Sequence, residues 1–364
     1  MTSYLASKFG IKAATEVADF ELANLSALQE YVRTAEVDCD FHLTRAVDVQ
    51  LNSKLNASLK NGYEKLLQAG AEVTKNVFYV DGKEAEIISG IKNAKGAFTY
   101  TAGHLWPYKL IHHMFSEALE KGVNLQTNTR VISISSERDN QGHWSVTTDR
   151  GVVRAERIIM AANAYTAALL SEFKDKIIPY RAICSRITTP GRSPLLPNTY
   201  ALRFNEWDFD YLIPRTDGSI IVGGARQAYY SRHKEWYNNV NDGELVRDTT
   251  HYFDGYMQRH FRGWESSGAK TDQVWTGIIA YSSDKLPHVG EVPDRKGVFI
   301  MGGFSGHGMP QIFLVAEGVA RMVAKDVSYE DTKLPRLFKT SIERLSSKEN
   351  SVLDLYDRFL KTKL

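Results

Sequence analysis

Residues 297–311 read GVFIMGGFSGHGMPQ. The apolar run at the start of this stretch predicts a short buried strand, and the glycines after it predict a turn. A helical pattern begins directly after the stretch. Because glycine has no side chain, such a turn lets backbone N–H groups approach a large flat ligand, and the helix directs its positive end at the same place. The stretch therefore predicts a ligand-facing loop in an α/β fold.

The composition narrows the class of protein. Hydrophobic residues make up 43% of the chain, charged residues 24%, and the net charge is +2, which is typical of a globular protein. So small a net charge gives no reason to expect a nucleic-acid partner. The sequence also contains no run of about eighteen apolar residues, so we expect no membrane partner. The only cysteines, Cys39 and Cys184, indicate neither a disulfide framework nor a metal site. We expect a cytoplasmic protein that acts on a small molecule.

The chain alternates between helical and strand patterns before residue 178. Apolar residues recur at helical spacing over 11–33, and 41–51 has the β-branched composition of a strand. Residues 96–134 read as strand, helix and strand, with Pro107 in the first helical turn. Residues 143–170 read as a meander that leads into a buried strand. From 178 to 290 the pattern changes to aromatic-rich strands, which predicts an antiparallel sheet.

Three stretches in this order resemble one family. They are YTAGHLWPYKLIHHMFSEALEKGVNLQTNTRV (100–131), RIIMAANAYT (157–166) and SSDKLPHVGEVPDRKGVFIMGGFSGHGMPQIFLVAEGVARMV (282–323). Together they resemble the FAD-dependent oxidoreductases that include D-amino-acid oxidase, glycine oxidase and sarcosine oxidase. The stretches ADFELANLSAL (18–28) and YLIPRTDGSIIVGGAR (211–226) look like fungal members of that family.

The resemblance implies a mixed α/β fold in which FAD lies between a dinucleotide-binding parallel sheet and an antiparallel substrate sheet. It assigns 1–37, 96–177 and 291–330 to the flavin side, 38–95 and 178–290 to the substrate side, and 331–364 to a helical tail. By position, Val131 would lie near the adenine, and Ala162 and Asn163 near the pyrophosphate. The residues implied at the flavin ring are Gly303, Ser305, Gly306, His307 and Gly308.

The 364 residues contain no G-x-G-x-x-G motif, although the family begins with a strand, that motif and a helix, which bind the pyrophosphate. We therefore expect a truncated parallel sheet with exposed strand edges and apolar helix faces. FAD binding is expected to be weak or lost. A homo-oligomer is one way to cover the exposed edges.

Candidate catalytic residues are His307, Arg226 and Tyr281. His307 is a general base or a ring-facing donor, or else a loop histidine that the backbone satisfies. Arg226 binds an anionic group, or else is a solvated strand terminus. Where relatives that oxidise amino acids carry a carboxylate-binding arginine, this sequence has Ile279. That difference favours a bulky, largely apolar substrate, with Tyr211, Trp275 and Ile279 in the cavity wall.

Three functions follow from these observations. The first is a flavin-dependent oxidase of amines or other C–N bonds, supported by the retained ring-side loop. The second is a flavin-independent isomerase or cyclase of secondary metabolism that reuses the same scaffold, with His307 acting directly. The third is a non-catalytic partner subunit whose open sheet edges another chain covers.

Overall fold

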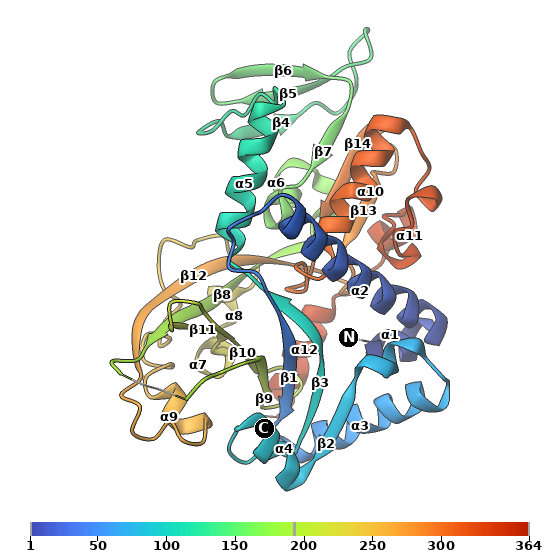
Figure 1. The fold of residues 1–364 in the computed structure, drawn as a ribbon. Coiled ribbons are helices and arrows are strands. Elements are labelled where there is room, and N and C mark those ends of the chain that lie inside the picture. Colours follow the sequence, from blue (N-terminus) through green and yellow to red (C-terminus); the bar gives the residue numbers. More distant parts are fainter. Residues whose placement is uncertain (1, 192–193, 363–364) are drawn as a thin grey trace.

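The computed structural model describes residues 2–191 and 194–362, and it shows a mixed α/β fold built on three sheets (Figure 1). The predicted fold class is confirmed. The largest sheet has eight strands and forms the lower half of the molecule in the view of Figure 1. Its order is β12 (Lys270–Ser282), β8 (Ile177–Thr188), β11 (Ile220–Gly224), β10 (Phe209–Pro214), β9 (Thr199–Arg203), β1 (His42–Gln50), β3 (Gly96–His104) and β2 (Phe78–Asp81).

Neighbouring strands of this sheet run antiparallel except for the parallel pair β1–β9. A hairpin at Asp217-Gly218 connects β10 and β11, with Gly218 at φ 80. β3 pairs along its whole length with β1. It therefore belongs to the eight-stranded sheet, although the expected division placed residue 96 at the start of the flavin-side segment. The sequence of β3 carries no sign of which sheet it joins, because that depends on its pairing with β1, a strand from an earlier part of the chain.

Two smaller sheets lie above the large one. One has the order β13 (His288–Glu291), β14 (Val298–Gly302) and β7 (Ile158–Met160), and β14 and β7 are parallel. The other is the meander β4 (Val131–Ile134), β5 (Trp144–Thr148) and β6 (Gly151–Ala155). β7 and β4 are each the last strand of their sheet. Ile159 on β7 is 44% exposed and Ile132 on β4 is 52% exposed, so both of these end strands carry exposed apolar side chains.

The helices connect these layers. The long predicted helix is α2 (Ile11–Thr34), and Gly10 at φ 85 separates it from α1 (Thr2–Phe9), which the periodicity did not reveal. α2 runs across the middle of the molecule and contacts α10 (Ile312–Lys325) (Figure 1). The remaining helices of eight or more residues in the described chain are α3 (Ser53–Gln68), α4 (Gly82–Ser89), α5 (Pro107–Glu120) and α12 (Ser351–Lys361).

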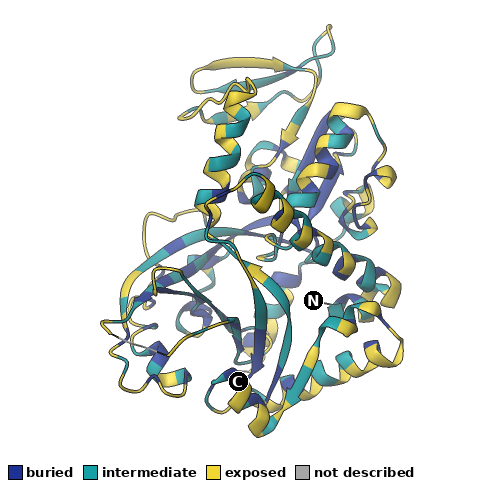
Figure 2. Cartoon of the chain, in the orientation of Figure 1, coloured by how far each residue is buried: buried dark blue, intermediate teal, exposed yellow. Residues whose placement is uncertain are grey.

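Burial is uneven between the layers (Figure 2). The main core lies around the eight-stranded sheet, with Val47, Leu202 and Val222 among its buried side chains, and α12 packs against it through Val352 and Phe359. α5, by contrast, leaves apolar side chains exposed along one face. Tyr108, Ile111, Phe115 and Leu119 are all exposed there, at steps of three and four residues. A stripe with helical spacing normally faces a partner layer, so this one is an uncovered packing surface.

Candidate functional site

The glycine-rich loop sits where the three-stranded sheet meets the eight-stranded one. It leaves β14 at Gly302 and enters α10 at Ile312. Gly303, Ser305 and Gly306 have φ of 74, 55 and 73, a left-handed run that glycine adopts readily. The Ser305 amide donates to the Ala280 carbonyl over 2.8 Å, which fastens the loop to β12.

The same loop is tied to the end of β7. Asn163 follows β7, and its Oδ1 accepts a hydrogen bond of 3.0 Å from the Gly303 amide. Asn163 itself has a left-handed φ of 44. Two stretches that the resemblance assigned to different ends of the cofactor are therefore in direct contact through Asn163 and Gly303. The side chain of Ser305 is also engaged, because its Oγ accepts from the Ser282 amide at 3.1 Å.

α2 holds the other side of the loop. Glu21 Oε1 accepts from His307 Nε2 at 3.1 Å and from Gln311 Nε2 at 2.7 Å. One turn further along, Asn24 Oδ1 accepts from the Leu314 amide at 3.0 Å. Although burial raises it, the hydrogen bonds from His307 and Gln311 hold the pKa of Glu21 below its usual value.

Glu21 and Asn24 were missed from the sequence. The signal was present, because Val17, Glu21, Asn24 and Leu28 recur at helical spacing and three of the four are buried. A polar residue within the stripe of a buried helix face needs a hydrogen-bond partner, and that partner is the loop.

One face of the eight-stranded sheet looks onto the loop side. Residues opposite each other in an antiparallel ladder share a face, and the ladder sets Trp275 opposite Cys184, Cys184 opposite Gly223, and Gly223 opposite Tyr211. The Tyr211 hydroxyl lies 2.9 Å from Cys184 Sγ. A side chain at Gly223 would overlap the Tyr211 ring, since its Cβ would stand 2.2 Å from the hydroxyl oxygen.

Ile279 and Tyr281 continue this face along β12. Both side chains lie next to the glycine-rich loop, because a Cβ added at Gly306 would lie 3.3 Å from the Tyr281 hydroxyl and 3.9 Å from Ile279. The structure thus assembles Trp275, Ile279, Tyr281 and Tyr211 on one face. Cys184 is half-buried and belongs to the same face.

Arg226 lies two residues after β11, at the first position of the short helix α7 (Arg226–Tyr229), and is only 8% exposed. The alternative that it is a solvated strand terminus is therefore wrong. Its Nη1 donates to the Trp207 carbonyl at 2.8 Å and its Nη2 to the Tyr281 hydroxyl at 2.7 Å. Aromatic rings surround the guanidinium, with centroids 5.3–5.9 Å from Cζ; they belong to Tyr180, Phe209, Tyr230 and Tyr281.

Two buried aspartates, Asp208 and Asp210, lie next to Phe209 in the chain. Asp208 is fully buried, and its carboxylate oxygens make no well-formed hydrogen bond in the described chain. Burial, with Asp210 nearby, raises the pKa of Asp208 to about 7, against the opposing influence of Gln227 and Arg226. Burial likewise raises the pKa of Asp210 to about 6, although the Ala225 amide donates to it at 2.8 Å.

A second arginine faces the same side of the sheet. Arg203 Nε lies 2.7 Å from Asp48 Oδ1, and Nη2 lies 2.8 Å from Oδ2, in a bidentate pair. Phe209 lies between the two guanidiniums, 5.2 Å from that of Arg203 and 5.4 Å from that of Arg226. Neither the ion pair nor this arrangement was predicted, because Asp48 and Arg203 are about 150 residues apart and meet only through the β1–β9 pairing.

Not every predicted site residue joins this group. Val131 lies on β4 and pairs with Thr148 in the separate meander. Ala162 precedes Asn163 and packs partly into the core that contains Met160 and Ile300. Tyr229 and Tyr230 are buried in the core.

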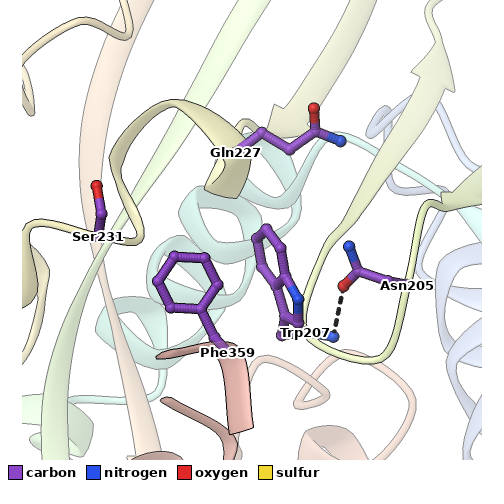
Figure 3. Close-up of a pocket in the computed structure, with 5 residues that line it drawn as sticks. All are labelled: Asn205, Trp207, Gln227, Ser231 and Phe359. Carbon is purple, nitrogen blue, oxygen red and sulfur yellow. Dashed lines mark hydrogen bonds between the residues drawn. The ribbon is translucent and has the colours of Figure 1, made fainter. Parts of the chain in front are cut away.

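A pocket of about 320 Å³ opens beside Trp207 (Figure 3). The Trp207 ring stands at its centre beside Phe359, and Asn205 Oδ1 accepts a hydrogen bond of 2.9 Å from the Trp207 amide. Gln227 and Ser231 complete the lining. Trp207 thus joins the pocket to the site, because its carbonyl receives Arg226.

Comparison with known proteins fits this geometry. The sequence pattern of a family described as "FAD dependent oxidoreductase" matches residues 3–322. The chain belongs to that family. The chain is 23% identical to a "Probable oxidoreductase" of Rhizobium meliloti (strain 1021), over 71% of this chain and 57% of that protein. It therefore spans little more than half the length of this relative.

Two further family members show the breadth of the similarity. The gamma-glutamylputrescine oxidoreductase of Escherichia coli (strain K12) is 22% identical over 89% of this chain and 71% of its own length. The crystal structure of glycine oxidase from Geobacillus kaustophilus superposes with a TM-score of 0.68 at 19% identity, covering 87% of this chain and 80% of that one. The family fold is thus present in these residues.

The family cofactor can be tested against the residues in place. The ring end fits, since three left-handed positions within residues 303–306, two of them glycines, bring backbone close to a flat group, with α10 directed at the loop. The diphosphate end does not fit within the described residues. After β7 the chain enters a single short turn and the four-residue helix α6 (Thr166–Leu169), and the Asn163 side chain is already bonded to Gly303.

The described residues contain neither a membrane-spanning helix nor a metal-binding cluster. None of their helices combines the length and apolar character needed to cross a membrane. No cluster of three or more His, Cys, Asp and Glu side chains within 2–191 and 194–362 is arranged to hold a metal ion.

Proposed function

We propose that the protein oxidises a C–N bond of a bulky, largely apolar small molecule with the help of a flavin. The observation that carries the proposal is the docking of the 303–308 loop onto the face of β12 at Ala280 and Tyr281. Family membership over residues 3–322 supports the same chemistry. A bound flavin would accept hydride from the substrate carbon.

The chain's own residues supply shape and charge. Trp275, Ile279 and Tyr211 form apolar and aromatic walls on one face of the sheet. These walls exclude water from the reacting carbon, which strengthens every electrostatic interaction inside the site. Because the Tyr281 hydroxyl accepts from Arg226, its own proton remains available to donate to a substrate atom. His307, held by Glu21, is the candidate base.

Arg226 is the proposed electrostatic residue. Its charge is buried among aromatic rings, and it forms no ion pair within 4.0 Å in the described chain. A buried cation of this kind stabilises negative charge that develops nearby. We propose that it acts through Tyr281, to which it is directly bonded.

The proposal is tested by oxidase assays on the purified protein reconstituted with FAD. A panel of secondary amines with aromatic or aliphatic substituents is screened for hydrogen peroxide release and for flavin bleaching without oxygen. Turnover of any member, lost on Tyr281→Phe or Arg226→Met, supports the function. Protein that binds flavin but reduces it with no amine of the panel counts against the substrate class.

A second function is favoured by one observation, the Glu21–His307 pair at 3.1 Å. A carboxylate-supported histidine performs proton transfer without a flavin, as an isomerase or cyclase of a bulky natural product requires. Solvent deuterium incorporation into a substrate by flavin-free protein would favour this function over the first.

We also propose that another copy of the chain covers the exposed edges of β7 and β4 and the stripe on α5. The exposed side chains Ile132, Ile159 and Phe115 support a contact surface at that position. The two cysteines, both free, support a reducing cytoplasmic setting.

A further inference from the structure

The contact between Glu21 and His307 determines more than the position of the imidazole. An ionised carboxylate only accepts hydrogen bonds, so in the 3.1 Å contact the donor is Nε2–H of His307. The hydrogen bonds from His307 and Gln311 favour that ionised state of Glu21, because they hold its pKa low. In the neutral ring, the proton therefore resides on Nε2 and the lone pair on Nδ1.

The acceptor is itself held in place. Gln311 Nε2 donates to the same Oε1 at 2.7 Å, and the Gln311 side chain is almost fully buried. Asn24 fixes the helix to the loop at two further points, accepting from the Leu314 amide at 3.0 Å and donating to the Met309 carbonyl at 3.3 Å. A base whose orienting group is anchored in this way loses little freedom when it reacts.

We propose that Glu21 is a positioning residue that fixes His307 in the Nε2–H tautomer, so that Nδ1 is the atom that takes up a proton in the site. The catalytic meaning of this inference rests on the proposed function, in either its flavin-dependent or its flavin-independent form. The tautomer itself does not depend on flavin, substrate or turnover. The same arrangement links α2 to the loop that follows β14.

The test is long-range ¹⁵N–¹H NMR on the full chain labelled at histidine nitrogens. The spectrum is recorded near pH 8.5, about two units above the ordinary histidine pKa. The His307 signals are assigned by their loss in His307→Asn. The wild type should show the Nε2–H tautomer in at least about tenfold excess, as expected for a hydrogen bond to a charged acceptor.

Two variants separate the acceptor from mere packing. Glu21→Met keeps the length of the side chain but removes the acceptor, so His307 should become a mixture of tautomers. Glu21→Gln retains an amide oxygen and should preserve the preference. Asp19→Asn, on the exposed face of the same helix, is the matched control and should change nothing.

The wild-type spectrum alone can overturn the proposal, whether or not Glu21→Met folds. An Nδ1–H tautomer or an even mixture in the wild type would contradict it. A folded Glu21→Met that retains the Nε2–H tautomer would also contradict it. If the tautomer is as predicted but no flavin or substrate is ever bound, the proposed function fails and this inference stands.

Discussion

The Arg226 guanidinium donates from Nη2 to the Tyr281 hydroxyl over 2.7 Å, and a Cβ added at Gly306 in the glycine-rich loop would lie 3.3 Å from that same hydroxyl. The bond connects the start of α7, just after β11, to β12, and β11 and β12 are two strands of one sheet separated by β8. It places a buried positive charge one hydrogen bond away from the residue that touches Gly306.

Tyr281→Phe should destabilise the protein by about 1–3 kcal/mol, because it leaves a buried N–H of a charged group without an acceptor. Urea unfolding at neutral pH measures the effect, with an unchanged m-value expected. Tyr108→Phe on the exposed face of α5 is the control and should stay within about 0.5 kcal/mol of wild type. Equal stabilities for Tyr281→Phe and Tyr108→Phe would show that the Arg226 bond does not contribute.

Asp208 predicts how stability depends on pH. Its pKa of about 7 in the folded chain is above the ordinary value of 3.8, so the folded state holds a proton that the unfolded state releases. The contribution of Asp208 to the free energy of unfolding should therefore be greatest below about pH 4 and should fall as the pH rises to 7. Asp208→Asn removes the dependence and should stabilise the protein at pH 8, by up to ~4 kcal/mol at 1.36 kcal/mol per pKa unit.

Thermal or urea unfolding of wild type and Asp208→Asn at pH 5, 6, 7 and 8 checks this prediction. The two curves should diverge as pH increases. Asp217→Asn in the exposed hairpin is the control, since its hydrogen bonds from Ser219 outweigh its partial burial and hold its pKa below the ordinary value. Parallel curves for wild type and Asp208→Asn across this range would be inconsistent with a buried, protonated Asp208.

Local patterns made the loop and its flanking elements predictable. The strand, the turn and the helix of 297–325 are contiguous, and each is encoded by residues next to one another. Arg226 could not be understood in the same way. Its burial depends on Tyr180, Phe209 and Tyr281, which come from three different strands, and no window of sequence contains more than part of that cage.

The same reason explains the residues that were missed. Asp48 and Arg203 each look like ordinary strand residues, and only the parallel pairing of β1 with β9 makes them partners. Glu21 lies on a helix stripe that was recognised, but its partner His307 is 286 residues away. Exposed edges were expected of the parallel sheet, and β7 is an end strand of the sheet that holds the parallel β14–β7 pair. The edge of β4 was not predicted, because β4 belongs to the antiparallel meander.

Gly306→Ala should lower stability by about 1 kcal/mol, because φ of 73 is unfavourable for a residue with a Cβ. The new methyl group would also press on the Tyr281 hydroxyl at 3.3 Å. The variant should therefore bind flavin more weakly as well. Gly243→Ala, in an exposed loop where a Cβ meets only Asn241 at 3.5 Å, should leave both properties unchanged, and an equal effect in the two variants would refute the assignment of the loop.

The uncovered stripe on α5 predicts self-association. Light scattering after size exclusion should give a mass above that of one chain, and Phe115→Lys should reduce it to one chain by placing a charge in the centre of the stripe. Ser116→Lys, on an adjacent exposed position of the same helix, is the matched control. A wild-type protein that remains monomeric at high concentration would contradict a homo-oligomer formed by this surface.

We propose that the described residues form the ring end of a flavin site but not its diphosphate end. Titration of the purified protein with riboflavin and with FAD, followed by flavin fluorescence and the visible absorbance band, tests both halves together. We predict that both ligands bind, and that FAD binds no more than about tenfold tighter than riboflavin, a difference in binding free energy of ~1.4 kcal/mol. Failure of both ligands to bind, or FAD binding orders of magnitude tighter than riboflavin, would contradict it.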